Sequence, residues 1–479
     1  MPPILAAVLT FLLIGYLFYR DYRQGLTPSP ALWIPCIWMI ILGSRSFGEW
    51  LYLGAPVSSG GGDAAEGSPL DRALFFGLMI AGFMVLVRRN VSFAQLVENN
   101  KAFAAFVLYC GVSILWSDFP FVAFKRWFKG FGDPIMVLII LTEPNPLKAV
   151  EIMLRVCMNL LVPLSVLFIK YYPYLGRAYS EWGMMVYTGV TTNKNMLGFT
   201  LMVYALFLLW ILYRRWGQRS ANWVDNVGIP LMLLGMVGWL FSMADSKTPL
   251  LSLGLAVSIF IALGLRSIRN HITALLVVGT LIFGTLQWSF DIKSSIAEGA
   301  GRDATFTGRT EVWDAVLSMQ EHPILGFGFD SFWLGDRLKT LQDMWYFRPT
   351  QSHSGYIEMY VNLGGVGLVF FAVVLISYYR KALKTILFRK EEEWVIFARV
   401  GMAFLFAYLI YNYTEAAFKT PHFLYVIFLL FVFSFSRHWG GAQPARQTRL
   451  YPDIGSTTQS AKGLAPSVIT RRPPYTFPG

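Results

Sequence analysis

The sequence is poor in charged residues. Only 14% of its 479 residues are Asp, Glu, Lys or Arg, whereas a soluble domain carries about a quarter. Acidic residues are the scarcer kind, 28 against 40 basic ones, which gives a formal net charge of +12. Cysteine is rarer still, since Cys36, Cys110 and Cys157 are the full set and each lies in an apolar stretch. They are interpreted as small core residues, which excludes a disulfide framework.

Sequence motifs for common cofactors are also missing. The chain has no GxxxxGK[ST] loop, which argues against the use of ATP. It has no paired Asp-x-Asp motif, and its five histidines are scattered, so neither a metal site nor a cofactor is predicted. No internal repeat of the kind found in many secondary transporters is present.

Long apolar runs are abundant instead. The sequence is 55% hydrophobic, and its apolar runs of roughly 17 to 25 residues are each long enough to span a bilayer as a helix. This predicts an all-α, polytopic membrane bundle of about 12–13 transmembrane helices, with the lipid bilayer as a partner and no nucleic acid. The first run, Ile4–Phe18, lacks a basic start and a cleavage site, so it is interpreted as a retained span. The expected cores of the spans are Ile4–Tyr19, Leu32–Leu42, Ala73–Val87, Phe103–Leu115, Val122–Leu141, Val150–Ile169, Leu197–Tyr213, Val227–Met243, Leu250–Leu265, Thr273–Trp288, Gly355–Tyr378, Val395–Tyr411 and Phe423–Phe435.

The distribution of basic residues predicts the orientation of the spans. Alternate loops carry most of the basic residues and are expected to be cytoplasmic, which places the N-terminus outside and the C-terminal tail inside. The expected organisation is N-terminal spans (1–115), central spans (116–290), a large periplasmic loop (291–352), C-terminal spans (353–436) and a disordered tail (437–479). Ser58–Ser68 is expected to be a flexible external loop. The basic residues that set this orientation are Arg20, Arg23, Arg88, Arg89, Lys148, Arg214, Arg215, Arg219, Arg266, Arg269, Arg380, Lys381, Lys384, Arg389 and Lys390.

The large external loop is expected to be partly helical. A helix is predicted to begin near Thr310, because Val312, Val316 and Met319 have the spacing of one apolar face. The His322-Pro323 pair follows this helix and ends it.

His353 lies where this polar loop meets a long apolar run, between Ser352 and Ser354. An imidazole there can act as a base near neutral pH while the following helix stays in lipid. A histidine at a helix start can equally bond a neighbouring carbonyl and have no other role. The polar surroundings favour the base.

Arg309 and Lys194 are the cations best placed to bind phosphate. Arg309 precedes the expected external helix, whose free N–H groups favour anions, although it could be a solvated loop arginine. Lys194 lies between Asn193 and Asn195 at the outer start of a span, where a snorkelling lysine is the alternative.

Further polar residues lie on the same predicted side. Three cations, Lys125, Arg126 and Lys129, fall early in the span expected over Val122–Leu141, and cations inside a span are costly without a partner or a cavity. Lys247 is an external turn lysine. The remaining candidates are Glu358 and Glu415, which could orient His353 or pair with a cation, and His422 as a reserve base.

With these residues in view, the chain resembles the superfamily of O-antigen ligases and of O-antigen and exopolysaccharide polymerases. The resemblance rests on an ordered set of short motifs spread over roughly Trp116 to Phe435. They are Gly189–Gly198 with its Asn-Lys-Asn, Ser246–Thr248, Gly308–Trp313, His322–Gly328, Ser352–Ser354 and Gly364–Gly367.

The resemblance implies a bacterial inner-membrane glycosyltransferase with its site facing the periplasm. It implies transfer of a glycan from an undecaprenyl-diphosphate carrier to an acceptor hydroxyl, with inversion and without a metal. His353 matches the family's proposed general base, and Arg309 matches an arginine that holds the diphosphate. Lys194 stands where many members carry arginine, and a lysine binds phosphate only as a point charge. The candidate substrate-binding set is Arg309, Lys194, Asn193, Asn195, Lys247, Arg126 and Glu415.

The acceptor separates the alternatives. A polymerase, favoured here for surface or exopolysaccharide, extends a lipid-linked repeat, a ligase uses lipid A–core, and a related branch glycosylates protein. A non-enzymatic transporter or flippase of the same glycan would need no base at the outer surface. It should also carry polar residues in both halves of the membrane, whereas the candidates here are expected to concentrate on one side.

Overall fold

The computed structural model describes residues 1–52, 68–179, 183–215, 223–274 and 309–435, and the following account concerns these residues. Their secondary structure is almost entirely helical, so the predicted all-α membrane bundle is confirmed. The predicted loop Ser58–Ser68 lies almost entirely outside the described residues, as does the span Thr273–Trp288. The predicted tail 437–479 and the first part of the large loop also lie outside them.

Prolines and serine caps start several helices of the N-terminal half. Proline is tolerated in a first turn because its missing N–H has no intrahelical partner there, and α1, α4, α7 and α9 all use it. At α4 the Ser68 side chain and the Asp71 carboxylate form a reciprocal capping box. The elements of this half are α1 (Pro3–Arg23), α2 (Trp33–Leu42), α3 (Phe47–Leu51), α4 (Pro69–Arg88), α5 (Phe93–Asn99), α6 (Lys101–Val112), the short 3-10 helix η2 (Ser113–Trp116), α7 (Pro120–Lys129), α8 (Gly132–Leu141) and α9 (Pro146–Tyr171).

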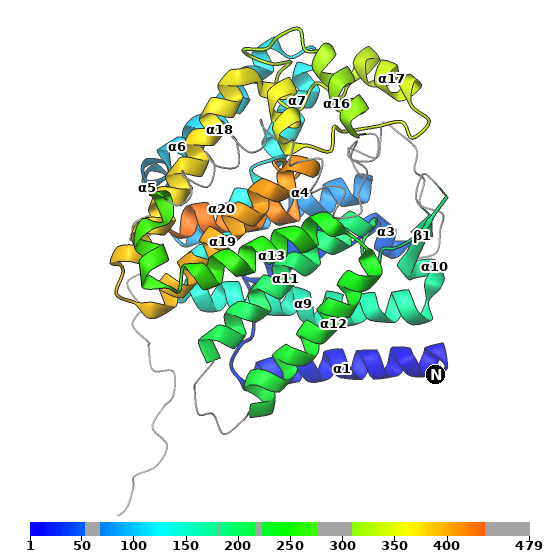
Figure 1. Cartoon of the computed structure of the whole chain (residues 1–479), viewed down its shortest axis with the longest axis vertical. Coiled ribbons are helices and arrows are strands. Elements are labelled where there is room, and N and C mark those ends of the chain that lie inside the picture. The colour runs from blue at the N-terminus through cyan, green and yellow to red at the C-terminus, as the bar shows by residue number, and fades with distance from the viewer. Residues whose placement is uncertain (53–67, 180–182, 216–222, 275–308, 436–479) are drawn as a thin grey trace, which may run out of the picture. The chain divides into compact units, whose positions relative to one another are not determined.

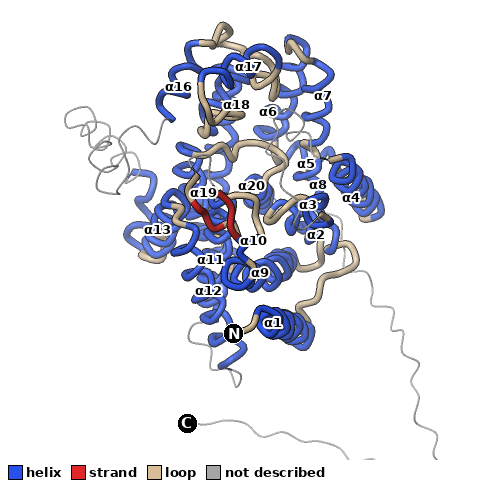
Figure 2. The backbone as a smooth tube through the Cα atoms, turned by 90° about the vertical axis from the view of Figure 1, so that its right-hand side faces the viewer, coloured by secondary structure: helices blue, strands red, loops and turns tan. Residues whose placement is uncertain are grey.

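The C-terminal half adds a small hairpin, further long helices, and a segment of two short helices over 309–352, which we call the 309–352 segment. The hairpin strands are antiparallel, with Ala178 opposite Val186 (Figure 2). The elements are α10 (Pro173–Gly176), β1 (Arg177–Tyr179), β2 (Met185–Tyr187), α11 (Lys194–Arg215), the π-helical turn η3 (Val224–Gly228), α12 (Ile229–Ala244), α13 (Lys247–Ala262), α16 (Arg309–Ser318), α17 (Gly335–Met344), α18 (Gly355–Phe388), α19 (Glu392–Thr414) and α20 (Phe423–Ser434).

Seven of the described helices are long and apolar enough to cross a membrane. An eighth span is possible if Lys247–Ala262 and Arg266–Ala274, which are bent by 118° at their junction, count as one. Three predicted spans correspond instead to shorter apolar helices, namely Trp33–Leu42, Lys101–Trp116 and Phe423–Ser434. Helix α9 is buried along most of its length, whereas α1, which packs beside it, is mostly exposed (Figure 1).

The prediction of one continuous span over Val122–Leu141 was wrong. The chain breaks after Lys129 into α7 and α8. At the start of α8, Gly132 lies so close to Trp38 that an added Cβ would fall 2.2 Å from the indole ring. Helix α7 carries its cations on one face, as expected for a surface helix. The three cations of α7 therefore do not lie inside a span.

Two of the glycine-rich motifs pack against each other. Helix α18 is interrupted at Gly364, whose φ of +65° favours glycine. The stretch that follows His322 runs alongside this interruption, where Gly365 N donates to Pro323 O at 2.9 Å. A Cβ on Gly326 or Gly364 would lie within 2.5 Å of the opposing backbone. Only glycine allows this approach, which fixes the 309–352 segment to the first part of α18.

Candidate polar site around Glu415

Glu415 is the meeting point of side chains from four separate segments. It follows α19 and is only 8% exposed. Its Oε1 accepts hydrogen bonds from Arg309 Nη2 and from Asn195 Nδ2, both at 2.8 Å. His353 Nδ1 lies 3.6 Å from Oε2. The structure thus brings together four predicted candidates, and we refer to Glu415, Arg309, Asn195 and His353 as the Glu415 cluster.

Local structure positions each member of the cluster. The helix predicted to begin near Thr310 is confirmed as α16, and Arg309 is its first residue. Asn195 stands in the first turn of α11 because the Asn193 side chain caps this helix, accepting from Met196 N at 2.8 Å. The loop before α18 is tied to the end of α19 by a hydrogen bond from Gly355 N to Glu415 O at 3.2 Å.

His353 lies in a tightly held, left-handed turn. Its φ is +54°, which is uncommon for a residue other than glycine and costs on the order of 1 kcal/mol or more. Hydrogen bonds hold both neighbours, since Ser352 Oγ donates to Ser354 O at 3.1 Å and Ser352 O accepts from Trp313 Nε1 at 2.7 Å. The His353 ring remains 38% exposed. The backbone therefore holds this imidazole at the surface of the site.

Glu358 stabilises this turn, and none of its described contacts involves His353. Its carboxylate accepts from the Trp333 indole N–H at 2.8 Å and from the backbone N–H of Ser352. Glu358 therefore connects Trp333 to the turn that carries the histidine.

The Glu415 carboxylate is held in its ionised form. Burial opposes ionisation, but the contact with His353 and the positive charge of Arg309 outweigh it and hold the Glu415 pKa below its usual value. An ionised carboxylate beside Nδ1 favours the tautomer with the proton on Nδ1. That tautomer leaves Nε2 of His353 free to accept a proton.

Two predicted cations flank the cluster. Lys194 immediately precedes Asn195 and is half-buried, and its ammonium forms no hydrogen bond or ion pair with the described residues. Lys247 begins α13 directly after Ser246, whose hydroxyl donates to Asn195 Oδ1 at 3.2 Å. Both lysines therefore stand next to residues that hold the cluster together.

Sequence reasoning missed Lys419, a further cation close to His353. Lys419 Nζ donates to Gln351 Oε1 at 2.9 Å, and the amide nitrogen of Gln351 lies 3.5 Å from His353 Nδ1. The sequence could have indicated Lys419 only through its place on the same connecting loop as Glu415, between α19 and α20. The contact itself depends on how the two loops pack.

The cations of α7 have other partners. Arg126 Nη1 donates to Asp330 O at 2.6 Å and lies 3.5 Å from its carboxylate. Lys125 lies over the Phe121 ring and Lys129 over the Phe75 ring. None of the described contacts joins these three cations to the Glu415 cluster.

His422 is buried and caps a helix. Its Nδ1 accepts from Leu424 N at 3.2 Å at the start of α20, and its ring packs against Phe199. Burial, with a smaller effect of Lys419, lowers the pKa of His422 to about 3. These contacts make His422 a poor alternative to His353 as a base.

Comparisons with known proteins relate the chain to O-antigen ligases and exopolysaccharide production proteins. Residues 231–372 match the model of the O-antigen ligase family. This segment contains Lys247, Arg309 and His353, whereas Asn195 and Glu415 lie outside it. Together with the apolar helices, the match confirms the predicted relationship to the O-antigen ligase and polysaccharide polymerase superfamily.

Two curated proteins are similar over most of their length. The exopolysaccharide production protein ExoQ of Rhizobium meliloti (strain 1021) is 24% identical over 344 residues, which are 67% of this chain and 74% of ExoQ. A protein of Rickettsia felis (strain ATCC VR-1525 / URRWXCal2), provisionally named as a polysaccharide ligase, is 23% identical over 315 residues. The aligned residues cover 63% of this chain and 72% of the Rickettsia protein. The comparisons support a membrane protein with an O-antigen or exopolysaccharide ligase-type function.

Proposed function

We propose that this protein transfers a glycan from an undecaprenyl-diphosphate carrier to an acceptor hydroxyl at the Glu415 cluster. The observation that carries the proposal is the contact of one ionised carboxylate with both an exposed histidine and an arginine. A base and phosphate-binding cations are the groups this reaction needs, because diphosphate is already a good leaving group. The proposed acceptor is a further lipid-linked glycan, which makes the protein a polymerase of surface or exopolysaccharide.

In the proposed reaction, His353 Nε2 removes the proton of the acceptor hydroxyl. The acceptor oxygen attacks the anomeric carbon, and the electron pair of the carbon–oxygen bond leaves with the diphosphate. A single displacement of this kind inverts the anomeric centre. Glu415 fixes the ring through Nδ1 and stabilises the imidazolium that forms.

The proposed diphosphate ligands are Arg309 and Lys194. The described contacts of Arg309 use two of its five N–H donors, one on Glu415 and one on Thr414 O. Its other donors bind no acceptor among the described residues, and we propose that they bind phosphate oxygens. Lys194 adds a point charge beside the same cluster. Asn193, Asn195 and Lys247 are proposed to contact the substrate around it. We propose that Arg126 contacts the substrate only at the edge of the site, because its guanidinium is bound to Asp330.

We place this site on the periplasmic side of the bacterial inner membrane. On the opposite side, the last turn of α11 and the first turn of α19 are joined by the ion pair between Arg214 and Glu393. The basic residues at that side are ones that the positive-inside rule assigns to the cytoplasm. The organisation predicted from the sequence, with the external loop between central and C-terminal spans, agrees with this proposal.

The test is glycan transfer by the purified protein in nanodiscs, with a lipid-diphosphate oligosaccharide as donor, EDTA present and product size measured. We expect longer glycans from the wild type and a loss of about 10² to 10⁴-fold in His353→Ala, the range for removal of a general base. His271→Ala is the matched control, because His271 is exposed, lies on another segment and bonds only Ser267 O among the described residues. It should keep wild-type activity.

Each other outcome has a definite meaning. Equal activity in His353→Ala and the wild type would overturn the assignment of the base. Transfer only when lipid A–core is added would make the protein a ligase. Movement of the unchanged donor across the membrane, without transfer to either acceptor, would make it a transporter.

A further inference from the structure

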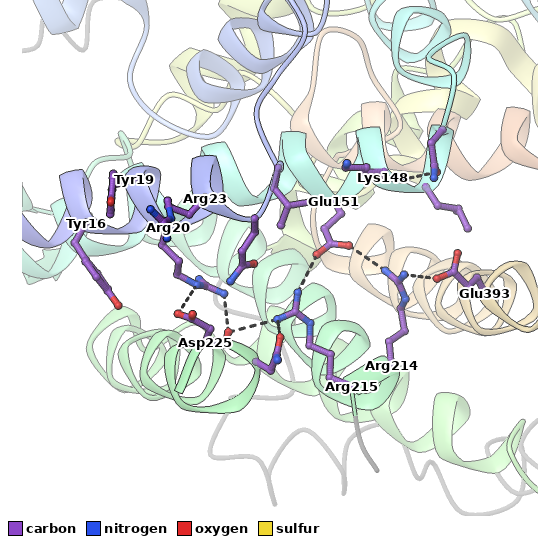
Figure 3. A pocket seen from close by; sticks show the side chains of 15 residues that line it. Tyr16, Tyr19, Arg20, Arg23, Lys148, Glu151, Arg214, Arg215, Asp225 and Glu393 are labelled. Carbon is purple, nitrogen blue, oxygen red and sulfur yellow. Dashed lines mark hydrogen bonds and ion pairs between the residues drawn. The ribbon is translucent and has the colours of Figure 1, made fainter. Parts of the chain in front are cut away.

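A second polar region lies at the other end of α11. Helix α11 begins at Lys194 and ends at Arg215, a length of roughly 33 Å at 1.5 Å per residue. A cavity of about 820 Å³ opens at its C-terminal end (Figure 3). Residues of α1, α9, α11, η3 and α19 line it. All five basic residues of the lining were predicted from the sequence to lie on the cytoplasmic side, namely Arg20, Arg23, Lys148, Arg214 and Arg215.

The lining of the cavity is more basic than acidic. Five cations line it against three carboxylates, a difference of +2. The amide side chains of Gln24, Asn145 and Asn226 add neutral hydrogen-bonding groups. The charged lining residues are Arg20, Arg23, Lys148, Arg214, Arg215, Glu151, Asp225 and Glu393.

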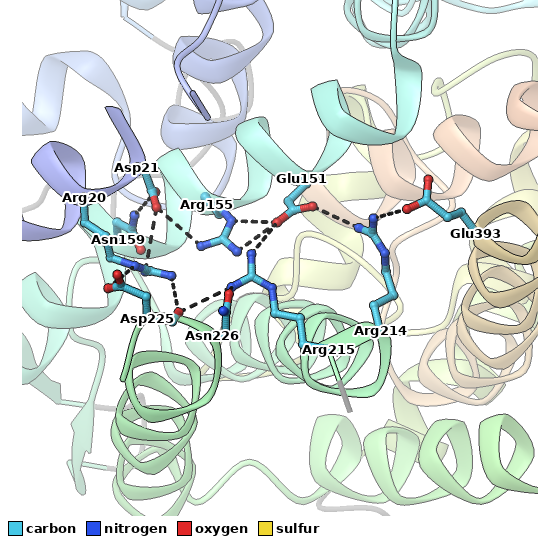
Figure 4. A network of polar contacts seen from close by, with 10 residues as sticks. All are labelled: Arg20, Asp21, Glu151, Arg155, Asn159, Arg214, Arg215, Asp225, Asn226 and Glu393. Atoms are coloured by element: carbon cyan, nitrogen blue, oxygen red, sulfur yellow. Dashed lines mark hydrogen bonds and ion pairs between the residues drawn. The ribbon is translucent and has the colours of Figure 1, made fainter. Parts of the chain in front are cut away.

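The carboxylates of the lining already pair with arginines, both with those of the lining and with the buried Arg155 (Figure 4). Glu151 Oε1 accepts from Arg155 Nη2 at 2.8 Å, and its Oε2 accepts from Arg214 Nη1 at 3.0 Å. Asp225 lies 3.3 Å from Arg20 Nε. Asp21 joins the two pairs, since its Oδ1 lies 3.4 Å from Arg155 Nη1 and 3.7 Å from Arg20 Nη1. We call these linked groups the Glu151 network.

Two cations at the rim are outside this network. The side chains of Arg23 and Lys148 are exposed and form no hydrogen bond or ion pair with the described residues. They come from the last turn of α1 and the first turn of α9. The excess positive charge of the cavity is therefore on the side that an incoming ligand meets first.

The cavity adjoins an exposed apolar surface of α1. Tyr16 and Tyr19 of α1 line it and are exposed, and further along the same helix Leu9 and Leu12 are exposed as well. Tyrosine is enriched where a span meets the headgroups. Helices α1 and α12 both pack on α9, and α12 also exposes apolar side chains such as Leu231. A basic, amide-lined cavity thus adjoins an apolar surface at the end of several spans.

We propose that this cavity binds the phosphate headgroup of an anionic phospholipid, with its acyl chains lying on the exposed face of α1. Arg23 and Lys148 supply the unpaired charge for the phosphate, and Asn145 and Gln24 supply hydrogen bonds to the rest of the headgroup. The Glu151 network holds α1, α9, α11 and η3 at the spacing that the headgroup occupies. This inference is independent of the proposed glycan transfer, because it concerns the other end of the spans.

The test is native mass spectrometry of the purified full-length protein in detergent, titrated with phosphatidylglycerol, phosphatidylcholine or glycerol phosphate. We expect phosphatidylglycerol to bind at least tenfold more tightly than phosphatidylcholine. The double variant Arg23→Gln/Lys148→Gln should weaken phosphatidylglycerol binding about tenfold or more, because each cation near a headgroup contributes on the order of a fivefold factor.

The matched control is Arg88→Gln/Lys390→Gln. It removes the same charge from exposed residues outside the cavity, at the end of α4 and between α18 and α19. It should change binding less than twofold. Gel filtration and thermal melting check folding, and the two single variants, each at an exposed position, replace the double variant if it unfolds.

Three outcomes would overturn the proposal. Equal weakening in the two double variants would mean that only general surface charge attracts the lipid. Equal affinity for phosphatidylglycerol and phosphatidylcholine would exclude headgroup recognition. Glycerol phosphate that binds as tightly as the lipid, with the same dependence on Arg23 and Lys148, would identify a soluble phosphate ligand instead.

Discussion

Helix α11 carries a polar cluster at each end, and the two clusters are built differently. The Glu151 network joins helix side chains to one another, and Arg155 at its centre is only 2% exposed. The Glu415 cluster joins loops and helix ends, and its histidine is 38% exposed in a left-handed turn. A buried network of ion pairs holds helices together, whereas an exposed imidazole beside a buried carboxylate is the arrangement that our proposed proton transfer requires.

The largest effect is expected on the stability of the protein when the Glu151 network is disrupted. Measuring it would sharpen the comparison between the two clusters. Glu151→Gln removes the charge shared by Arg155, Arg214 and Arg215. Breaking a buried ion pair in this way typically costs about 3–5 kcal/mol, so we expect a clearly lower melting temperature in detergent. Transfer activity per folded molecule should stay within about twofold. The comparison would fail if this variant kept its stability and lost activity.

A smaller effect is expected on transfer when the charge of the Glu415 cluster is removed. In Glu415→Gln the amide oxygen can still accept from Arg309 and Asn195, but its N–H group then faces His353 Nδ1. This favours the tautomer with the proton on Nε2, which cannot accept the proton of the acceptor hydroxyl at that atom. We expect transfer to fall about 10²-fold.

The matched control for this variant is Glu311→Gln, an exposed carboxylate in the first turn of α16. Product formation is measured at a fixed concentration of folded protein. If Glu415→Gln and Glu311→Gln were equally active, Glu415 would have no role in orienting the histidine.

The smallest predicted effect is on the pH dependence of stability. Because the Glu415 pKa lies below its unfolded value of about 4.5, the carboxylate stabilises the folded protein above that pH. This contribution is lost as pH falls through the lower, folded-state pKa. Melting temperatures measured from pH 7 down to pH 3 should therefore converge for the wild type and Glu415→Gln. A difference that stays constant down to pH 3 would contradict the ionised carboxylate.

The sequence was informative about single elements. Apolar periodicity located α16, and the Asn-Lys-Asn motif marked the start of α11 at Lys194. The sequence did not reveal the break between α7 and α8 within Val122–Leu141. An apolar run does not show that Gly132, at the start of α8, packs closely on Trp38. The sequence also did not reveal the small hairpin of β1 and β2, because three-residue strands leave no periodic signal.

By itself the sequence determined that this is a helical membrane protein and which histidine and cations stand at the ends of its spans. Only the tertiary structure decided that Glu415 joins them. Asn195 and Arg309 are 220 and 106 residues away from it along the chain, and such contacts depend on how helices pack and not on local patterns. The same packing decided that Glu151 and Glu415, two buried carboxylates at opposite ends of the spans, meet different partners. Glu151 meets arginines, whereas Glu415 meets an arginine, an amide and an exposed histidine.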